Sequence, residues 1–288
     1  MQASVLTTAI MPFALGVIML GLGLSLTLDD FRRISRYPKA ITLALVSQMF
    51  LLPILCFLLA RAFHMPPELA VGIMLLSASP GGPTANLYSH LSNGDVALNI
   101  TLTATNSLLS LFTLPFIVNL SLDYFMQSGE YLPMQFRKVS EVFAIVLVPV
   151  ALGMTIKANA PHFAKRMDKP VKILSAMFLA LVITLITISE RHTVVQYFPR
   201  LGTPVLLFNV LSMAIGYFLP RLFRVEKRQA IAIGMEIGIH NGTLAIFIAL
   251  NVMHNPTMAL PSGTYGLLMF FTAAAFGMLV NLKRSHPV

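Results

Sequence analysis

Hydrophobic and polar positions in this chain are arranged in long blocks. Uncharged and largely apolar runs occupy residues 1–28, 40–60, 69–94, 96–122, 142–156, 173–189, 201–220 and 237–282. A helix needs roughly 20 such residues to cross the hydrocarbon core of a bilayer, and several runs reach that length. Because the apolar stretches are continuous rather than alternating, they predict membrane-spanning α-helices and not the strands of a β-barrel.

The blocks predict an all-α polytopic membrane protein with nine helices. Their approximate ranges are 4–27, 39–62, 67–92, 95–120, 136–157, 169–189, 202–221, 226–253 and 262–282. If these helices alternate in direction, 15 of the 20 Lys and Arg residues fall on one side, within 32–39, 157–172, 221–228 and 283–284. Basic residues concentrate in short cytoplasmic loops. We therefore expect the N-terminus outside and the C-terminus in the cytoplasm, in a bacterial cytoplasmic (inner) membrane, with lipid around the helices.

Composition excludes several classes of protein. Only 11% of the residues are charged, against about 25% in soluble domains. The net charge of +9 follows from the basic loops, so it does not indicate nucleic-acid binding. The single cysteine, Cys56, lies among apolar residues and is expected to be a packing thiol. The first segment lacks a basic start, so we expect no cleavable signal peptide. The chain has no HExxH or GxSxG motif and no paired aspartates in its spans, so we do not expect an enzyme.

Two of the predicted helices contain residues that interrupt an α-helix. The third contains Pro80-Gly81-Gly82-Pro83, and the eighth contains His240-Asn241-Gly242. Proline removes a backbone donor and glycine has low helix propensity, so both helices are expected to unwind there. Unwound backbone at membrane depth is tolerated where protein or a water-filled cavity covers it.

The positions of the two breaks suggest an internal repeat in a single membrane domain. Each broken helix is third in a four-helix unit, the first at about 4–120 and the second at about 169–282. An odd helix at about 136–157 links the units and gives them opposite orientations. Two inverted units with matching breaks are typical of a secondary transporter.

Glu236 is the only formally charged residue between Arg228 and Lys283, a stretch of roughly fifty residues in the last predicted helices. A carboxylate inside a membrane domain is costly, and such residues mark ion or substrate paths. A purely structural role needs a buried cation, but the neighbouring spans offer no Lys or Arg. His240 follows Glu236 by four residues and is therefore expected on the same helical face. It can share a proton with the carboxylate, or it can simply close the break as a neutral side chain.

Oxygen-bearing side chains near the breaks suggest a site for a hard cation. Na⁺ prefers carboxylate, amide, hydroxyl and backbone carbonyl oxygens. Asn86 follows the first break, Asn99 and Thr103 lie one turn apart on the fourth helix, and Gln48 lies within the second. Each has an alternative role, because amides also join helices in membranes and Thr103 can bond the carbonyl one turn back. The second half-helices begin near Thr84 and Thr243, and helix N-termini attract anions.

At these residues the sequence resembles the bile acid:sodium symporter family over nearly its whole length. The motifs that carry the resemblance are Pro80-Gly81-Gly82 with Thr84-Ala85-Asn86, then Gly94-Asp95-Val96-Ala97-Leu98, then Glu236-Ile237-Gly238-Ile239-His240-Asn241-Gly242, and Met19-Leu20-Gly21-Leu22-Gly23-Leu24 with Asp30-Phe31. The resemblance implies a panel domain and a core domain, with two broken helices that cross in the core.

The resemblance also implies the ligand sets. A first sodium site would use Asn86, Asn99, Thr103 and Glu236. A second would use Gln48, Glu236, the backbone carbonyls of Ile237 and Ile239, and the side chain at His240. The organic anion would bind beside the breaks, at residues Pro83, Thr84, Asn241, Gly242 and Thr243.

Three features depart from the family pattern. Ala85 stands where many relatives have a serine ligand, although Asn99 brings an amide where serine is usual. His240 stands where glutamine is usual, so one sodium ion, two sodium ions, or coupling influenced by a proton on His240 are all compatible with the sequence. The nine predicted helices are one fewer than in most bacterial relatives, and the missing helix would precede the first.

The function predicted from the sequence is sodium-coupled import of an organic anion, either an amphipathic bile-acid-like molecule or a small carboxylate, with no obligatory protein partner. Two alternatives stay open. One is a metalloid or anion exporter of the same superfamily, although Cys56 lies away from both breaks. The other is a membrane ligand sensor that does not transport.

Overall fold

The computed structural model describes residues 11–126, 136–189 and 191–282, and most of these residues are helical. The helices are α1 (Met11–Ser25), α2 (Leu28–Arg32), η2 (Arg33–Arg36), α3 (Pro38–Val46), η3 (Ser47–Leu51), α4 (Leu52–Ala62), α5 (Pro67–Ala78), α6 (Pro83–Leu91), α7 (Val96–Met126), α8 (Phe136–Asn159), α9 (Pro161–Ser189), α10 (Arg191–Leu222), α11 (Lys227–Gly238), α12 (Gly242–Phe247), η4 (Ile248–Val252), η5 (Thr257–Ala259) and α13 (Leu260–Asn281). Within the described ranges the only extended pairing is one isolated bridge, between Gly81 and His240. The all-α class expected from the sequence is confirmed.

Several helices are suited to a membrane. Four of them are long and apolar enough to cross it: Pro38–Ala62, Val96–Met126, Leu201–Leu222 and Thr257–Asn281. A fifth crossing is possible in the described part of the chain if the bent pair Pro12–Ser25 and Leu28–Arg36 counts as one span. The described helices overlap all nine predicted ranges, but nine crossings and an inverted repeat remain predictions. Residues 4–10 of the first predicted helix and the basic pair at 283–284 lie outside the described residues.

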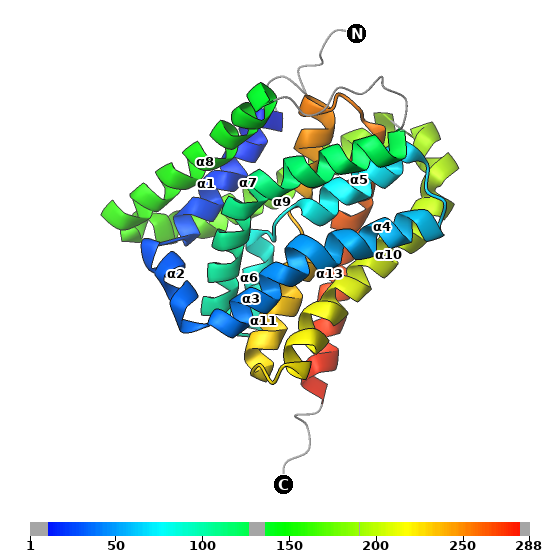
Figure 1. Ribbon diagram of the computed structural model, residues 1–288. Helices are drawn as coiled ribbons and strands as arrows, with labels where there is room; N and C mark the ends of the chain where they lie inside the picture. The colour runs from blue at the N-terminus through cyan, green and yellow to red at the C-terminus, as the bar shows by residue number, and fades with distance from the viewer. Residues whose placement is uncertain (1–10, 127–135, 190, 283–288) are drawn as a thin grey trace.

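The helices form two groups with the interrupted helices between them (Figure 1). In the first group, α1 packs on α8 and α9. Glycines allow this close approach: a side chain on Gly153 would come within 2.7 Å of the backbone of Gly23 and Leu24. The ammonium group of Lys157 donates to the Ser25 carbonyl at 2.6 Å and satisfies one open acceptor at the end of α1. On the other side, α10 packs on α4, α11 and α13.

The two interrupted helices unwind close to where the sequence predicts. The first is divided into α5 and α6, and the second into α11 and the segment Gly242–Val252. Pro83 and Gly242, which the sequence analysis placed in the breaks, are instead the first residues of their second halves. Proline is well tolerated at the first position of a helix, where its missing N–H has no helical partner in any case.

A wide turn in the second predicted helix was not foreseen. Residues Ser47–Leu51 form a π-helical turn, in which the amide of Leu52 donates to the Ser47 carbonyl. Pro53 follows directly, and it has no N–H to donate to the carbonyl four residues before it. Such single π turns are frequent at functional sites. This one contains Gln48, which is 4% exposed.

Candidate functional site

The two breaks cross and bond to each other through the backbone. The amide of Gly82 donates to the Ile239 carbonyl at 3.2 Å, and the amide of Asn241 donates to the Pro80 carbonyl at 2.8 Å. These bonds flank the bridge between Gly81 and His240. Each break therefore satisfies part of the backbone that the other has unwound, and no water is needed for these groups.

Glu236 lies at this crossing and is fully buried. Its Oε2 accepts a hydrogen bond from the Thr103 hydroxyl at 2.6 Å, and its Oε1 accepts one from the Asn106 amide at 3.2 Å. The Gly81 backbone also lies against the carboxyl group, because a Cβ placed on Gly81 would come within 2.7 Å of both of its oxygens. Glu236 forms no ion pair with a Lys or Arg among the described residues. Its charge is held by neutral donors alone.

Four buried amide oxygens are left without hydrogen-bond donors among the described residues. The Oδ1 atoms of Asn86, Asn99 and Asn106 are buried and unpartnered within the described residues, and so is Oε1 of Gln48. A buried acceptor without a donor costs free energy, so such groups call for an unplaced partner. Of these four residues, Asn106 contacts the carboxylate directly and Asn99 contacts the same helix one turn earlier, at Ala232. Carboxylate and amide oxygens are the ligand types that suit a hard cation such as Na⁺.

The predicted ligands Asn99 and Thr103 lie side by side against α11. The Asn99 amide donates to the Ala232 carbonyl at 2.7 Å, and Thr103 reaches Glu236 one turn further along. The Thr103 hydroxyl is also 3.0 Å from the Asn99 carbonyl, the local bond considered as its alternative role. The structure therefore places Asn99, Thr103 and Glu236 together, while each side chain also joins helices.

Gln48 and His240 meet at a single carbonyl. The amide of Gln48 donates to the carbonyls of Ser77 and Ser79, at 3.2 and 3.0 Å. The Nδ1 atom of His240 lies 3.0 Å from the same Ser79 carbonyl. Because a carbonyl only accepts, Nδ1 carries a proton, and in a neutral ring the buried and unpartnered Nε2 is left with a lone pair.

The expectation that His240 shares a helical face with Glu236 was wrong. The helix α11 ends at Gly238, so the four-residue spacing no longer defines a common face. The imidazole ring instead stacks on Phe208 at 5.7 Å and meets the edge of Tyr265 at 5.3 Å. Among the described contacts it has no hydrogen bond to the carboxylate. His240 closes the break, as one alternative proposed.

A second group of donors fixes the end of α11. The Gly238 carbonyl accepts from the Asn209 amide at 2.9 Å and from the Tyr265 hydroxyl at 2.8 Å. Thr272 in turn hydrogen-bonds Asn209. These contacts hold the last turn before the break from α10 and α13. The sequence analysis did not identify them, because lone polar residues in apolar helices look alike whatever they contact.

The donor set is that of an alkali cation rather than a transition metal. Within the described ranges no three His, Cys, Asp or Glu side chains cluster. Cys56 is a free, buried thiol in α4. One carboxylate with hydroxyl and amide oxygens lacks the soft ligands that hold zinc or copper.

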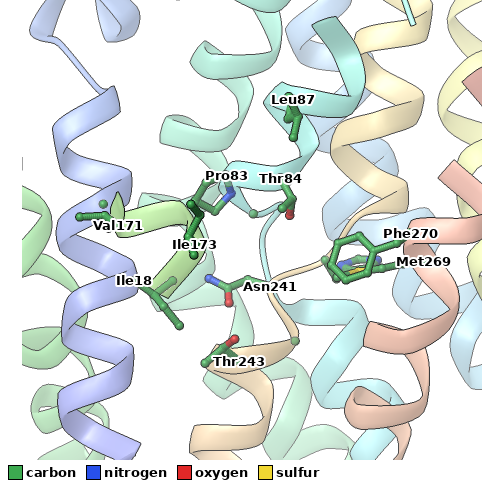
Figure 2. Close-up of a pocket in the computed structure, with 14 residues that line it drawn as sticks. Ile18, Pro83, Thr84, Leu87, Val171, Ile173, Asn241, Thr243, Met269 and Phe270 are labelled. Atoms are coloured by element: carbon green, nitrogen blue, oxygen red, sulfur yellow. The ribbon is translucent and has the colours of Figure 1, made fainter. Parts of the chain in front are cut away.

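A cavity of about 280 Å³ lies beside the crossing (Figure 2). Its lining residues come from α1, α9, α13, the two breaks and the half-helices α6 and α12 that follow them: Ile18, Gly21, Gly82, Pro83, Thr84, Leu87, Val171, Ile173, His240, Asn241, Gly242, Thr243, Met269 and Phe270. The structure therefore gathers in one cavity all five residues that the sequence analysis placed around the organic anion. The apolar wall from α1, α9 and α13 was missed, because its residues resemble ordinary packing residues in sequence.

The cavity contains a few polar groups in mostly apolar walls. The side-chain oxygen of Asn241 accepts a hydrogen bond from the Leu244 backbone amide at 3.1 Å and so caps α12. The side-chain nitrogen of Asn241, Nδ2, has no partner among the described residues. The hydroxyls of Thr84 and Thr243 also have no described hydrogen-bond acceptor and line the same cavity. Both second half-helices begin at the cavity, at Pro83 and Gly242. Donors and helix N-termini in an apolar pocket suit an anionic group on a largely apolar molecule.

Comparison with known proteins gives one family. Residues 12–197, about two thirds of the chain, match the sequence model of the Sodium Bile acid symporter family. That stretch includes the first break and the helix that carries Asn99, Thr103 and Asn106. The family is one of transporters, in agreement with the expectation that the chain is not an enzyme.

Individual relatives cover most of the chain at modest identity. The uncharacterized sodium-dependent transporter YocS of Bacillus subtilis is 27% identical over 257 residues, which are 88% of this chain and 77% of that protein. The hepatic sodium/bile acid cotransporter of Rattus norvegicus is 27% identical over 92% of this chain and 73% of its own. The probable sodium/metabolite cotransporter BASS2, chloroplastic, of Oryza sativa subsp. japonica is 27% identical over 95% of this chain, but that match spans 64% of its own length.

Proposed function

Because the chain belongs to the sodium bile acid symporter family, we propose that it is a sodium-coupled secondary transporter that imports an organic anion. The observation that carries the proposal is the buried carboxylate of Glu236, which has no described Lys or Arg partner and only neutral donors, one of them an asparagine whose own oxygen is unpartnered. A mobile Na⁺ supplies the missing positive charge. The names of three relatives include sodium, which supports the choice of ion.

The first sodium site in this proposal consists of Asn86, Asn99, Thr103 and Glu236. The two amides present Oδ1 atoms that lack donors within the described residues, and Thr103 and Glu236 are already in contact. All four groups are oxygen ligands, the type that hard cations prefer. This set holds the ion that the transport cycle requires.

The second proposed site consists of Gln48, Glu236, Ile237, Ile239 and His240. In a continuous helix the Ile237 carbonyl would accept a hydrogen bond from the backbone amide of Asn241. That amide donates to the Pro80 carbonyl instead, so the Ile237 carbonyl lacks its helical donor. Two side-chain atoms of this proposed site, Oε1 of Gln48 and Nε2 of His240, also have no hydrogen-bond partner among the described residues. A nitrogen ligand suits Na⁺ less well than an oxygen. The transport stoichiometry is one Na⁺ if only the first site fills and two if both fill.

The cavity beside the crossing is the proposed substrate site, with Pro83, Thr84, Asn241, Gly242 and Thr243 around the anionic group. One of its walls comes from α1 and α9 and the other from the crossing and α13. Movement of the α1–α8–α9 group against the crossing would open the cavity to alternate sides of the membrane. With the N-terminus outside, as the basic loops predict, the Na⁺ gradient of a bacterial inner membrane drives import.

The test of this function is uptake into proteoliposomes that contain the purified protein. Radiolabelled cholate and a set of short-chain monocarboxylates serve as probes, with external Na⁺ replaced by K⁺ at equal ionic strength. At least one probe is expected to accumulate with Na⁺ and not with K⁺. Equal uptake in both salts contradicts sodium coupling. Thermal stabilisation by a probe without any flux favours the sensor alternative.

We predict that Asn241→Ala weakens substrate binding more than it weakens sodium binding. The change removes a donor from the cavity and the cap of α12, so the KM for the transported anion should rise about tenfold or more. The free energy of unfolding should fall by about 1 kcal/mol from loss of the cap. Uptake kinetics at saturating Na⁺ and thermal unfolding measure the two effects.

Asn251→Ala is the matched control for this variant. The Asn251 amide donates only to the Phe247 carbonyl one turn back, and the residue does not line the cavity. It should leave the KM unchanged. A similar KM in both variants would contradict a role for Asn241 at the anion.

A further inference from the structure

Asn106 contacts the site but is not among the predicted sodium ligands. It lies on α7, is 1% exposed, and donates from Nδ2 to Oε1 of Glu236 at 3.2 Å. Thr103 holds the other carboxylate oxygen. The two side chains therefore fix the plane of the carboxylate from one helix.

The orientation of the Asn106 amide follows from the chemistry of its partner. An ionised carboxylate only accepts hydrogen bonds, so the amide must present its nitrogen to Glu236. Its oxygen then points away from Oε1. That Oδ1 is buried and has no donor among the described residues. A fully structural asparagine would be expected to satisfy both ends of its amide, as most buried polar groups do.

The position of Asn106 along α7 continues the series of proposed sodium ligands. Asn99, Thr103 and Asn106 are separated by four and three residues, which places all three on one helical face. That face lies against α11, where Asn99 bonds Ala232 and the other two bond Glu236. The unpartnered oxygens of Asn99 and Asn106 thus lie one turn to either side of the Thr103 contact.

We propose that Asn106 is a further residue of the sodium site. Its Nδ2 orients Glu236 and its Oδ1 is an oxygen ligand for the cation. This assignment rests on the proposed function, because it presumes that Na⁺ binds at Glu236. It also gives a reason for the unpartnered Oδ1, which a role in helix packing alone does not.

The experiment measures binding of radioactive Na⁺ to the purified protein in detergent, without any organic substrate. Asn106→Ala loses both the oxygen and the donor, so the Kd for Na⁺ is expected to rise at least about tenfold. With saturating Na⁺, the KM for a transported probe should stay within about twofold of wild type, since Asn106 does not line the cavity. This separation distinguishes a sodium-site residue from one that only stabilises the fold.

The matched control is Thr105→Val on the same helix. The Thr105 hydroxyl donates only to the Thr101 carbonyl one turn back, and valine keeps its shape. Its Kd for Na⁺ should equal that of wild type. An equal Kd in Asn106→Ala and Thr105→Val overturns the proposal.

A second variant keeps the proposal testable if Asn106→Ala folds poorly. Asn106→Asp retains oxygen ligands but places a second carboxylate beside Glu236, and the repulsion is relieved when a cation lies between them. Na⁺, compared with K⁺, should therefore raise the Tm of Asn106→Asp more than that of wild type. An increase no larger than in wild type counts against ligation by Asn106.

Failure of this inference differs from failure of the proposed function. If wild type binds Na⁺ and Glu236→Gln does not, but Asn106→Ala binds like wild type, then Asn106 is a packing residue and sodium coupling stands. If the wild-type protein shows no saturable Na⁺ binding, or if K⁺ displaces all the Na⁺ that binds, the proposed function itself is wrong.

Discussion

A Glu236→Gln variant is expected to lose Na⁺ binding and Na⁺-driven uptake together. Glutamine keeps the shape of the side chain but removes the only formal charge at the crossing. Affinity of oxygen sites for hard cations depends on the number of charged ligands. Removal of one partner from a buried charge pair costs roughly 2–5 kcal/mol, so the Kd for Na⁺ should rise about 30-fold or more.

The loss of charge in Glu236→Gln also changes what the neighbours can do. The carboxylate accepts hydrogen bonds from Thr103 and Asn106 at once, one on each oxygen. The Nε2 of glutamine is a donor and cannot accept from these groups, so at least one of the contacts breaks. The effect on stability without Na⁺ should still be small, because the variant no longer buries a charge without a cation. Melting in K⁺ and then in Na⁺ shows this: the Tm of wild type should rise with Na⁺, and that of the variant should not.

Glu226→Gln is the control for removal of a negative charge. Glu226 lies at the other end of α11, at its N-cap, and its side chain is exposed. Its variant should bind Na⁺ and take up the probe as wild type does. If Glu236→Gln transports under a Na⁺ gradient as well as Glu226→Gln, the carboxylate is not the coupling site and the proposed mechanism is wrong.

The sequence was sufficient to predict the two breaks and the buried charge beside them, because these signals are one-dimensional. A lone charge in an apolar run identifies Glu236, and proline and glycine in the apolar helices mark both breaks. The crossing of those breaks depends on tertiary contacts, and it was expected only through the family resemblance. The bonds from Gly82 to Ile239 and from Asn241 to Pro80 now describe how the two breaks are joined.

The features that the sequence analysis did not predict have separate physical causes. The face assigned to His240 assumed that α11 continued past Gly238, and a helix end moves every later side chain. Asn106 was passed over although it completes the spacing of Asn99 and Thr103, because a single asparagine in an apolar helix often only joins helices. The α1 and α9 walls of the cavity could not be predicted, since Ile18 and Val171 have no chemistry that distinguishes them from residues packed elsewhere.

Gly81→Ala is expected to impair Na⁺ binding although residue 81 contributes no side chain. A Cβ on Gly81 would meet the Glu236 carboxyl group, with Oε2 at 2.7 Å and Oε1 and Cδ closer still. The carboxylate cannot move away without losing its contacts to Thr103 and Asn106. The free energy of unfolding should fall by about 1–3 kcal/mol, and the Kd for Na⁺ should rise about tenfold or more.

The next residue supplies the control for Gly81→Ala. A Cβ on Gly82 would have its nearest neighbours at 3.6 Å, the Thr84 hydroxyl, and at 4.0 Å, the Asn241 Cα. These are ordinary contacts, and the φ of Gly82, −107°, is open to any residue. Gly82→Ala should therefore keep the Na⁺ affinity of wild type, although it borders the cavity and can change the KM of the anion. Equal Na⁺ affinity in the two variants would contradict a fixed carboxylate beside Gly81.

A double-mutant cycle then tests the cause of the Gly81→Ala effect. If the clash with the carboxylate is responsible, Glu236→Ala removes it, and Gly81→Ala should cost less stability in that background than in wild type. Contacting residues commonly show coupling of about 0.5–3 kcal/mol, whereas distant ones are additive. Thermal unfolding of the four proteins in K⁺ gives this coupling without any contribution from bound Na⁺. Additive effects would mean that Gly81→Ala acts on the backbone of the first break rather than on Glu236. The position of the Glu236 carboxylate would then depend less on its contact with the first break than the geometry indicates.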